Sequence, residues 1–412
     1  MESDKRSLDL ILKISEICNF KCSFCSSTTL GESESDYLDI QYVFDFLHRF
    51  PNTNTIIING GEPILKQHLS FYVKLIDFLD KNNYRASIAI TSNLWDFFKN
   101  PDRWIELFKN PRVGVTTSFQ YNNPAYPNTG RLKPNFEHYT EADFWKISDL
   151  FLDKIGYRPD FISVIDETNC HLAIKNVELA KKMSNNNIPT GFNSETKTAV
   201  ECKLNYVMKS GPIKYYTKKD GTVIKQGAAD SSFVMGEIYK IHVEIWKLGL
   251  FPWEHSTKEM MKVLKDSGKS TICPLNRSCD SGIRVLNPTS NKTSGKSSVI
   301  NRYFSCPAFS DKLDSVASID YQKEIKEGDF FTPLQKTSNL NSLKKSCYFC
   351  PLFNICNGCR STISDFKQKG GEVIEKHCQI MKSLAPDILK SNGFSDVEIS
   401  KMITPYKQEF LV

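Results

Sequence analysis

The sequence predicts an α/β protein, a partial (β/α)6 TIM-like barrel followed by a cysteine-rich C-terminal domain. From residue 8 to about 193, short β-branched runs alternate with longer amphipathic runs. This alternation is typical of βαβ units that build a parallel sheet. Beyond residue 272 the chain becomes polar and carries eight of its 13 cysteines.

Each element is justified by the period of its apolar residues. Strands are predicted for short apolar or alternating runs, and helices for runs with apolar residues three and four positions apart. The predicted strands are 8–15, 55–59, 86–93, 113–119, 161–166 and 188–193. The predicted helices are 37–50, 69–83, 141–155, 172–187 and 237–248. Loops at the carboxyl ends of such strands carry the chemistry of barrel enzymes.

Three further segments have their own patterns. A hairpin is predicted over 215–225, with its turn at Asp220-Gly221. The Ser/Asn/Lys tract at 289–301 is typical of an exposed loop, and 380–403 is predicted to be helical. The predicted domains are a barrel (1–236), a linker helix region (237–272), a cysteine-rich domain (273–380) and a helical tail (381–412).

Composition places limits on function. Apolar residues make up 40% of the 412 positions and charged residues 24%, which is typical of globular proteins. No apolar run is long enough to cross a bilayer, and the start MESDKRSLDL has no signal-peptide core. We therefore predict a cytoplasmic protein with no membrane partner. Because that compartment keeps thiols reduced, the 13 cysteines favour metal or cluster ligation over disulfides.

Three cysteines follow the first predicted strand. Cys18, Cys22 and Cys25 lie in the stretch CNFKCSFC. Thiolates suit zinc or iron–sulfur clusters, but structural zinc needs four ligands, and no fourth Cys or His is nearby. A [4Fe–4S] cluster held by three cysteines keeps one iron open, so the pattern predicts a cluster that binds a small molecule.

The spacing CxxxCxφC, with Phe24 as the aromatic residue, resembles the signature of the radical SAM superfamily. The resemblance implies that S-adenosylmethionine (SAM) binds the open iron and that Phe24 contacts its adenine. It also implies that one electron from an external flavodoxin- or ferredoxin-type reductant cleaves SAM. The 5′-deoxyadenosyl radical then removes a hydrogen atom from the substrate.

A second motif follows the second predicted strand. Gly60, Gly61, Glu62 and Pro63 resemble the GGEP motif of the same superfamily, which binds the amino group of SAM. The residues support this by themselves, since glycines allow a ligand to approach the backbone and a carboxylate favours an ammonium. The alternative is an ordinary strand-to-helix turn in which Pro63 begins the helix.

Polar residues also follow the third and fourth strands. Asn93, in the run Thr91-Ser92-Asn93, and Ser118 occupy places where relatives bind the carboxylate and ribose of SAM. Relatives often carry an Asp two positions after that serine, where this chain has Gln120. Polar residues are common at strand ends in any barrel, which is the alternative interpretation.

The eight C-terminal cysteines resemble the SPASM extension, which carries two auxiliary [4Fe–4S] clusters. Zinc is the alternative, but the two CxxC pairs of CYFCPLFNICNGC are closer together than in a zinc ribbon. Pro307 stands where the sulfatase-maturing branch has an Asp base, so sulfatase maturation is disfavoured. The resemblance assigns one cluster to Cys273, Cys279, Cys306 and Cys359, and the other to Cys347, Cys350, Cys356 and Cys378.

Some residues belong to neither motif. Cys170 and Cys202 are interpreted as small buried or idle thiols, with catalysis by Cys202 as the alternative. The lysines and tyrosines of 203–225 suit a solvated face, or else single-stranded nucleic acid or an acidic peptide. His68, His138 and His255 are predicted to be surface residues.

The resemblance predicts a radical SAM enzyme with three [4Fe–4S] clusters, most of whose SPASM relatives modify peptides or proteins. A peptide or protein substrate is therefore the first hypothesis. The rival enzyme hypothesis is a small metabolite or a nucleic-acid base, and a duplexed base would first have to be flipped out. A third hypothesis is a zinc-stapled binding protein without catalysis. The catalytic base is not predicted.

Overall fold

The structure, a computed structural model, describes residues 8–25, 37–186, 199–206, 214–217, 220–226, 235–259, 283–293, 296–304 and 371–403. The predicted strand 188–193 and the predicted auxiliary-cluster cysteines other than Cys378 lie outside these residues. Within the described ranges, no helix is long and apolar enough to span a bilayer.

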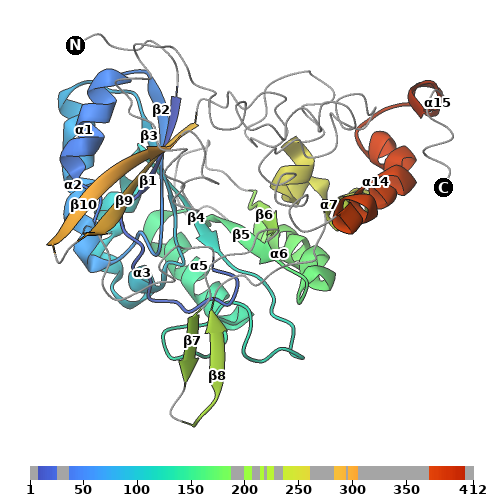
Figure 1. Cartoon of the computed structure of the whole chain (residues 1–412), viewed down its shortest axis with the longest axis horizontal. Coiled ribbons are helices and arrows are strands. Elements are labelled where there is room, and N and C mark those ends of the chain that lie inside the picture. Colours follow the sequence, from blue (N-terminus) through green and yellow to red (C-terminus); the bar gives the residue numbers. More distant parts are fainter. Residues whose placement is uncertain are drawn as a thin grey trace.

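A single eight-stranded sheet organises the N-terminal part of the chain (Figure 1). Its order is β10 (Lys296–Phe304), β9 (Ile283–Thr293), β1 (Leu8–Lys13), β2 (Thr53–Asn59), β3 (Ser87–Thr91), β4 (Val113–Ser118), β5 (Asp160–Ile165) and β6 (Cys202–Tyr206). The seven strands from β9 to β6 are parallel, and β10 is antiparallel to β9. The predicted partial barrel is confirmed as a half-barrel of parallel strands.

Helices connect the parallel strands and cover one face of the sheet (Figure 1). They are α1 (Ile40–Arg49), α2 (Leu69–Lys81), α3 (Trp95–Lys99), α4 (Ile105–Lys109), α5 (Glu141–Ile155) and α6 (Ala173–Asn185). The bounds predicted for α5 are exact. A capping box between Thr140 and Asp143 begins this helix, and Gly156, with φ of +102°, ends it.

The two faces of the sheet differ in burial. On β5, Phe161, Ser163 and Ile165 are fully buried, whereas Ile162 and Val164 are only partly buried. Phe161 packs edge-on against Phe144 of α5, with ring centroids 5.2 Å apart. The buried face is therefore the outer face, under the helices. Because parallel neighbours in register share a face, the inner face carries Ile57, Ser118, Ile162 and Lys203.

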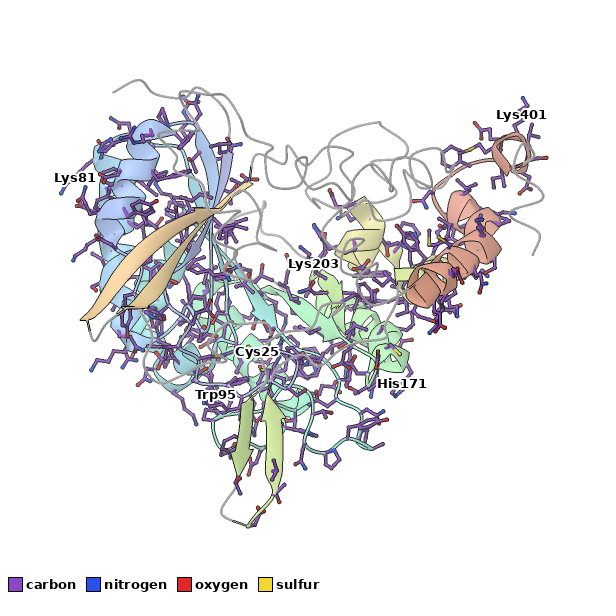
Figure 2. All side chains as sticks on the ribbon, viewed as in Figure 1. Cys25, Lys81, Trp95, His171, Lys203 and Lys401 are labelled. Atoms are coloured by element: carbon purple, nitrogen blue, oxygen red, sulfur yellow. The ribbon has the colours of Figure 1, made fainter. Side chains whose placement is uncertain are left out.

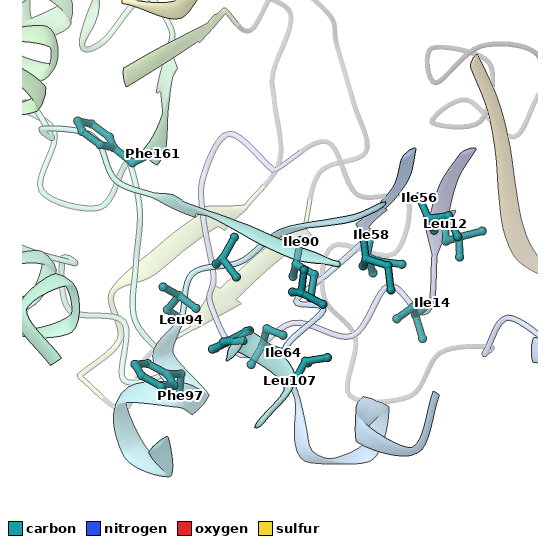
Figure 3. Packing of buried hydrophobic residues seen from close by; sticks show 14 of the residues in the cluster. Leu12, Ile14, Ile56, Ile58, Ile64, Ile90, Leu94, Phe97, Leu107 and Phe161 are labelled. Atoms are coloured by element: carbon teal, nitrogen blue, oxygen red, sulfur yellow. The ribbon is translucent and has the colours of Figure 1, made fainter. Parts of the chain in front are cut away.

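The main core lies between the outer face and the helices (Figure 3). Ile56, Ile58 and Ile90 come from adjacent strands, and Phe97 and Leu107 from the short helices α3 and α4. All five side chains are buried in one cluster. This packing fixes the strands, and with them the loops at their carboxyl ends.

Two predictions about the sheet are wrong in detail. The strand beside β5 is Cys202–Tyr206, in a segment where the alternation was expected to have ended. The tract 289–301, expected to be an exposed loop, contributes to the β9–β10 hairpin, in which Thr289 pairs with Ile300. Neither β6 nor the β9–β10 hairpin is evident from the sequence, because both are rich in polar residues. Edge strands and two-stranded ribbons do not need an apolar run.

The C-terminal helices form a second, smaller core. α7 (Met235–Lys247) packs against α14 (Gly371–Ser391) through Tyr239, Val243, Met381, Ala385 and Ile388, and α15 (Asp396–Ile403) adds Ile399. The two longer helices lie side by side in Figure 1. This arrangement confirms helical structure over most of 380–403.

The predicted hairpin at 215–225 is also confirmed. β7 (Lys214–Thr217) pairs antiparallel with β8 (Val223–Gln226). Gly221, with φ of +83°, lies in the turn between them. This two-stranded sheet is separate from the half-barrel sheet.

Candidate active site

The two N-terminal motifs meet at the carboxyl ends of β1, β2 and β3. The cysteine loop follows β1, the Gly-Gly-Glu-Pro segment follows β2 and Asn93 follows β3. Asn93 Nδ2 donates to Asn19 Oδ1 over 2.8 Å, which joins the third loop to the first. The sequence-predicted residues of these three loops therefore form one site.

The three thiols of the cysteine loop lie close enough to influence one another. Cys22 is buried, and Cys18 and Cys25 are partly buried against the main core. Burial raises the pKa of Cys18 well above its usual value, and the charges of Glu62, Cys22 and Cys25 raise it further. Within the described part of the chain, no three Cys, His, Asp or Glu side chains are arranged to hold one metal ion.

The two glycines of the second motif allow a close approach between two loops. Gly61 N donates to Ser15 O over 2.9 Å, and Glu62 N donates to Ile17 O over 2.7 Å. A Cβ atom on Gly60 would lie 2.4 Å from Ser15 O, and one on Gly61 would lie 2.2 Å from Ile17 O. Gly60 also has φ of +122°. The glycines are therefore required by the cysteine loop, and not only by a ligand.

The far side of the cysteine loop is tied to the segment after β4. Lys21 N donates to Leu132 O over 2.9 Å, and Ser23 N donates to Gly130 O over 3.0 Å. Gly130 N in turn donates to Ser23 Oγ over 2.7 Å. Backbone hydrogen bonds thus hold the cysteine loop on both sides.

Glu62 is the buried acidic group of the site. Its Oε1 accepts hydrogen bonds from Ser92 Oγ and Ile64 N, and its Oε2 accepts one from Asn93 N over 2.8 Å. A carboxylate can accept about four hydrogen bonds, so acceptor capacity is left for a cationic ligand. Burial raises the pKa of Glu62 from 4.5 to about 7, although these hydrogen bonds oppose the shift. A bound ammonium would favour the ionised form.

His68 is buried, which corrects the prediction of a surface residue. His68 Nε2 lies 3.0 Å from Ser15 Oγ, and His68 Nδ1 lies 2.9 Å from Pro63 O. Tyr72 OH donates to the same Pro63 carbonyl over 3.2 Å. Burial lowers the pKa of His68, so the neutral ring joins the end of β1 to the second motif.

Phe24 is covered by an arginine that the sequence did not single out. The guanidinium carbon of Arg131 lies 5.3 Å from the Phe24 ring centroid, and Arg131 Nε donates to Gln120 Oε1 over 3.1 Å. Near this end of the strands, the buried atoms Gln120 Nε2 and Asn59 Oδ1 have no partner among the described residues. Unpartnered buried polar atoms are expected where a ligand supplies the missing hydrogen bond.

Ser118 lies on the inner face at the end of β4, with little exposure. The register pairs Ser118 with Ile162 on β5, and Ile162 with Lys203 on β6. These three residues form one row across the inner face. The row extends from the predicted SAM site toward the far edge of the sheet.

The other three cysteines of the described residues, Cys170, Cys202 and Cys378, lie outside these three loops. Cys202 is fully buried on the outer face, where its thiol donates to Ser163 Oγ over 3.4 Å and burial raises its pKa. That position favours a structural thiol over a nucleophile. Cys170 is partly buried before α6, and Cys378 is partly buried on α14.

The donor set suits an iron–sulfur cluster better than a single ion. Three soft thiols from one loop are the donor set of a cluster that keeps one iron open. Glu62 and the unpartnered polar atoms supply contacts for a polar, cationic ligand next to it. Figure 2 shows Cys25 and Trp95 at this end of the half-barrel.

Comparison with known proteins matches the N-terminal part of the chain to one superfamily. The family model of the radical SAM superfamily matches residues 12–165. A GTP 3′,8-cyclase of Nautilia profundicola is 31% identical over 96 residues, which is 22% of this chain. An uncharacterized protein of Methanocaldococcus jannaschii is 30% identical over 86 residues, which is 20% of this chain. Each match spans 29% of the curated relative's length.

Two solved structures of one protein have a fold similar to that of this chain. The structure of anSMEcpe with bound AdoMet has a TM-score of 0.59 at 15% identity, covering 97% of this chain and 98% of that chain. The structure of anSMEcpe with bound AdoMet and the Cp18Cys peptide has a TM-score of 0.53 at 14% identity, covering 90% and 99%.

Proposed function

We propose that this chain, whose residues 12–165 match the family model of the radical SAM superfamily, cleaves SAM reductively and uses the resulting radical to modify a peptide or protein. The observation that carries the proposal is the joining of the cysteine loop to the buried Glu62 through paired backbone hydrogen bonds. This joining brings a three-thiol cluster loop and an ammonium-binding carboxylate into one site.

Each residue of the site has a proposed role. Cys18, Cys22 and Cys25 hold the cluster, which when bound supplies the electron and the open iron for SAM cleavage. Glu62 binds the amino group of SAM and is itself oriented by Asn93. Gly60, Gly61 and Pro63 shape the turn that carries Glu62.

Four further residues are proposed to surround the rest of the SAM molecule. The ring of Phe24 contacts adenine, and Ser118 supplies a hydroxyl to SAM from the inner face. Gln120 Nε2 and Asn59 Oδ1 remain available for hydrogen bonds to SAM. The main core behind the strands keeps water away from the radical on the outer side.

The C-terminal cysteines are proposed to hold two auxiliary [4Fe–4S] clusters. Their number and spacing resemble the SPASM domain, and the fold match to anSMEcpe supports the proposal. We propose the domains 1–236, 237–272, 273–380 and 381–412 on the same basis. The electron donor is proposed to be an external flavodoxin- or ferredoxin-type protein.

The substrate is proposed to be a peptide or protein. The support is the shared fold with anSMEcpe, a protein whose solved structures include one with a bound peptide. A second candidate, a small metabolite, is favoured by the local sequence match to GTP 3′,8-cyclases. Mass spectrometry of candidate peptides and nucleotides after turnover separates the two.

Anaerobic reconstitution with iron, dithionite and SAM tests the proposed chemistry. The wild-type protein is expected to hold about twelve irons per chain and to release 5′-deoxyadenosine. Cys22→Ala is expected to abolish this release and to retain about eight irons, because only the SAM-binding cluster loses a ligand. An iron-loaded wild-type protein that releases no 5′-deoxyadenosine, or a preparation that holds zinc in place of iron, would contradict the proposal.

A further inference from the structure

The inner face of the half-barrel carries one lysine on β6, Lys203. It lies in the middle of β6, between Cys202 and Leu204, which are both buried on the outer face. Lys203 therefore belongs to the inner face, as its pairing with Ile162 also indicates. Among the described residues, the inner-face residues of β5 and β6 are partly buried or exposed, whereas their outer-face residues are buried.

The carboxylate whose charge acts on Lys203 already accepts hydrogen bonds from other residues. Glu254 is the acidic group whose charge acts on Lys203, and it is buried beside the edge of β6. Its Oε1 accepts from Leu204 N and Ser256 N, both over 3.1 Å, and its Oε2 accepts from the backbone N and Oγ1 of Thr257. Four donors fill the usual capacity of a carboxylate. Glu254 therefore makes its hydrogen bonds to the helical turn that follows it and to Leu204, and makes none to Lys203.

The ammonium of Lys203 has no hydrogen-bond or ion-pair partner among the residues that the structure describes. Lys13, which is on the inner face of β1, differs, because it lies 3.7 Å from Glu16. Burial lowers the pKa of Lys203, and the charge of Glu254 only opposes this shift. A partly buried cation without a contacting counter-ion gains the most from an anionic ligand.

The position of Lys203 relative to the SAM site fits a substrate contact. Ser118, Ile162 and Lys203 are successive neighbours across β4, β5 and β6. Two strand spacings separate the backbones of Ser118 and Lys203, a distance of about 10 Å. A group bound by Lys203 would thus lie on the inner face, beside the proposed SAM site and without overlapping it.

We propose that Lys203 binds an anionic group of the substrate, a carboxylate or a phosphate, on the inner face of the half-barrel. This inference rests on the proposed function, since it takes the inner face to be where the substrate lies. For a peptide substrate, the anion is an acidic side chain or a terminal carboxylate. For a metabolite, it is a carboxylate or a phosphate close to the reacting carbon.

Protection of the Lys203 amine tests the inference on the iron-loaded, SAM-bound wild-type protein. Reductive methylation is followed at each lysine by mass spectrometry, with acetate, inorganic phosphate or chloride present at matched ionic strength. At least a threefold slower methylation of Lys203 in acetate or phosphate is expected. Lys181, an exposed lysine of α6, is the control and is expected to react equally in all three salts.

The pattern of protection also identifies the source of the anion. Protection by acetate, and by a Glu-containing peptide over its Gln counterpart, supports a carboxylate. Protection by phosphate alone supports a phosphorylated substrate. Equal methylation rates of Lys203 in acetate, phosphate and chloride would overturn the inference.

A variant separates this inference from the proposed function. Lys203→Gln is expected to keep the basal release of 5′-deoxyadenosine, because Lys203 lies away from the SAM contacts. Loss of that release in a folded, iron-loaded Lys203→Gln protein would place Lys203 in the SAM site and overturn the assignment. Absence of release from the wild-type protein would instead refute the proposed function. Should the variant fail to fold, the methylation experiment on the wild-type protein still decides.

Discussion

Glu62 shows how a single buried side chain combines structural and functional demands. Its carboxylate accepts hydrogen bonds from Ser92, Asn93 and Ile64, which hold the loop after β3 against the loop after β2. Those contacts do not fully offset burial, so the pKa of the carboxyl group is raised to about 7. Without a cationic ligand, an ionised Glu62 is therefore a source of instability.

Replacing Glu62 by Gln tests this conclusion in the SAM-free protein. Below pH 4.5 the carboxyl group is protonated in both the folded and the unfolded states. Between pH 4.5 and about 7 only the unfolded state loses the proton, so the stability of the wild-type protein falls as pH rises through this range. The neutral amide does not titrate. We compare the free energy of unfolding of Glu62→Gln with that of the wild type at each pH. This difference should be about 3 kcal/mol more favourable to the variant above pH 7 than below pH 4.5.

Urea unfolding of both proteins below pH 4.5 and above pH 7 measures this difference. Added SAM should reduce the loss of wild-type stability between acidic pH and pH 7, because the ammonium of SAM stabilises the ionised carboxylate. Parallel pH profiles for the two proteins would show that Glu62 ionises normally in the folded state.

The turn after β2 shows what can be predicted at the scale of an element. The sequence pattern predicts that Gly60, Gly61 and Glu62 directly follow a strand, and the structure confirms this position. The reason for the glycines could not be predicted, because it depends on contact with Ser15 and Ile17 from another loop. The prediction of His68 as a surface residue is wrong for the same reason, and Arg131 is not predicted at all, since both reach the site only through tertiary placement.

Adding a methyl group to this turn should displace the cysteine loop. Gly60→Ala would place Cβ 2.4 Å from Ser15 O, at a φ of +122° that L-residues rarely adopt. A loss of about 2–3 kcal/mol in the free energy of unfolding is expected. Gly114→Ala on β4 is the matched control, because nothing lies within 4 Å of its Cβ.

Chemical unfolding and iron content check both glycine variants. Gly60→Ala should also lose iron from the SAM-binding cluster, whereas Gly114→Ala should retain it and match the wild type in stability or exceed it slightly. Equal stability of the two variants would show that the turn after β2 is free to move away from Ser15.

Other elements differ in how clearly the sequence encodes them. α2 and α5 were predicted because their apolar residues repeat over three or more turns. The helices α3 and α4, of five residues each, are too short for such a repeat and were not predicted. β9 and β10 are polar, so their pairing depends on backbone hydrogen bonds and on the partner strand rather than on an apolar pattern.

At the scale of the whole molecule, the half-barrel contains a strand from the C-terminal half of the chain. Residues 283–286 of β9 pair with Asp9–Leu12 of β1 and cover what would otherwise be an exposed sheet edge. Beyond residue 286, β9 pairs only with β10. The N-terminal motif strand and the C-terminal region are therefore parts of one sheet.

Proline substitutions in β9 test the importance of that junction. Val285→Pro should break the pairing with Ile11 and remove a buried side chain, with a loss of about 3 kcal/mol or more in stability. Ser290→Pro, which pairs with Val299 in the outer hairpin, is the control within the same strand and should cost less. Light scattering should detect association of the Val285→Pro protein through its open edge. A monomeric, stable Val285→Pro protein would show that β9 is dispensable.

The hydrogen bonds on both sides of the cysteine loop affect what happens to the loop when oxygen damages the proposed cluster. Many small metal-binding modules collapse when their ion is removed, because the metal supplies their folding energy. Here Ser15, Ile17, Leu132 and Gly130 fix the course of the loop through backbone contacts that involve no thiol. If oxygen removes iron from the proposed cluster, we therefore expect the loop to keep its course, so that added iron and sulfide suffice to rebuild the cluster.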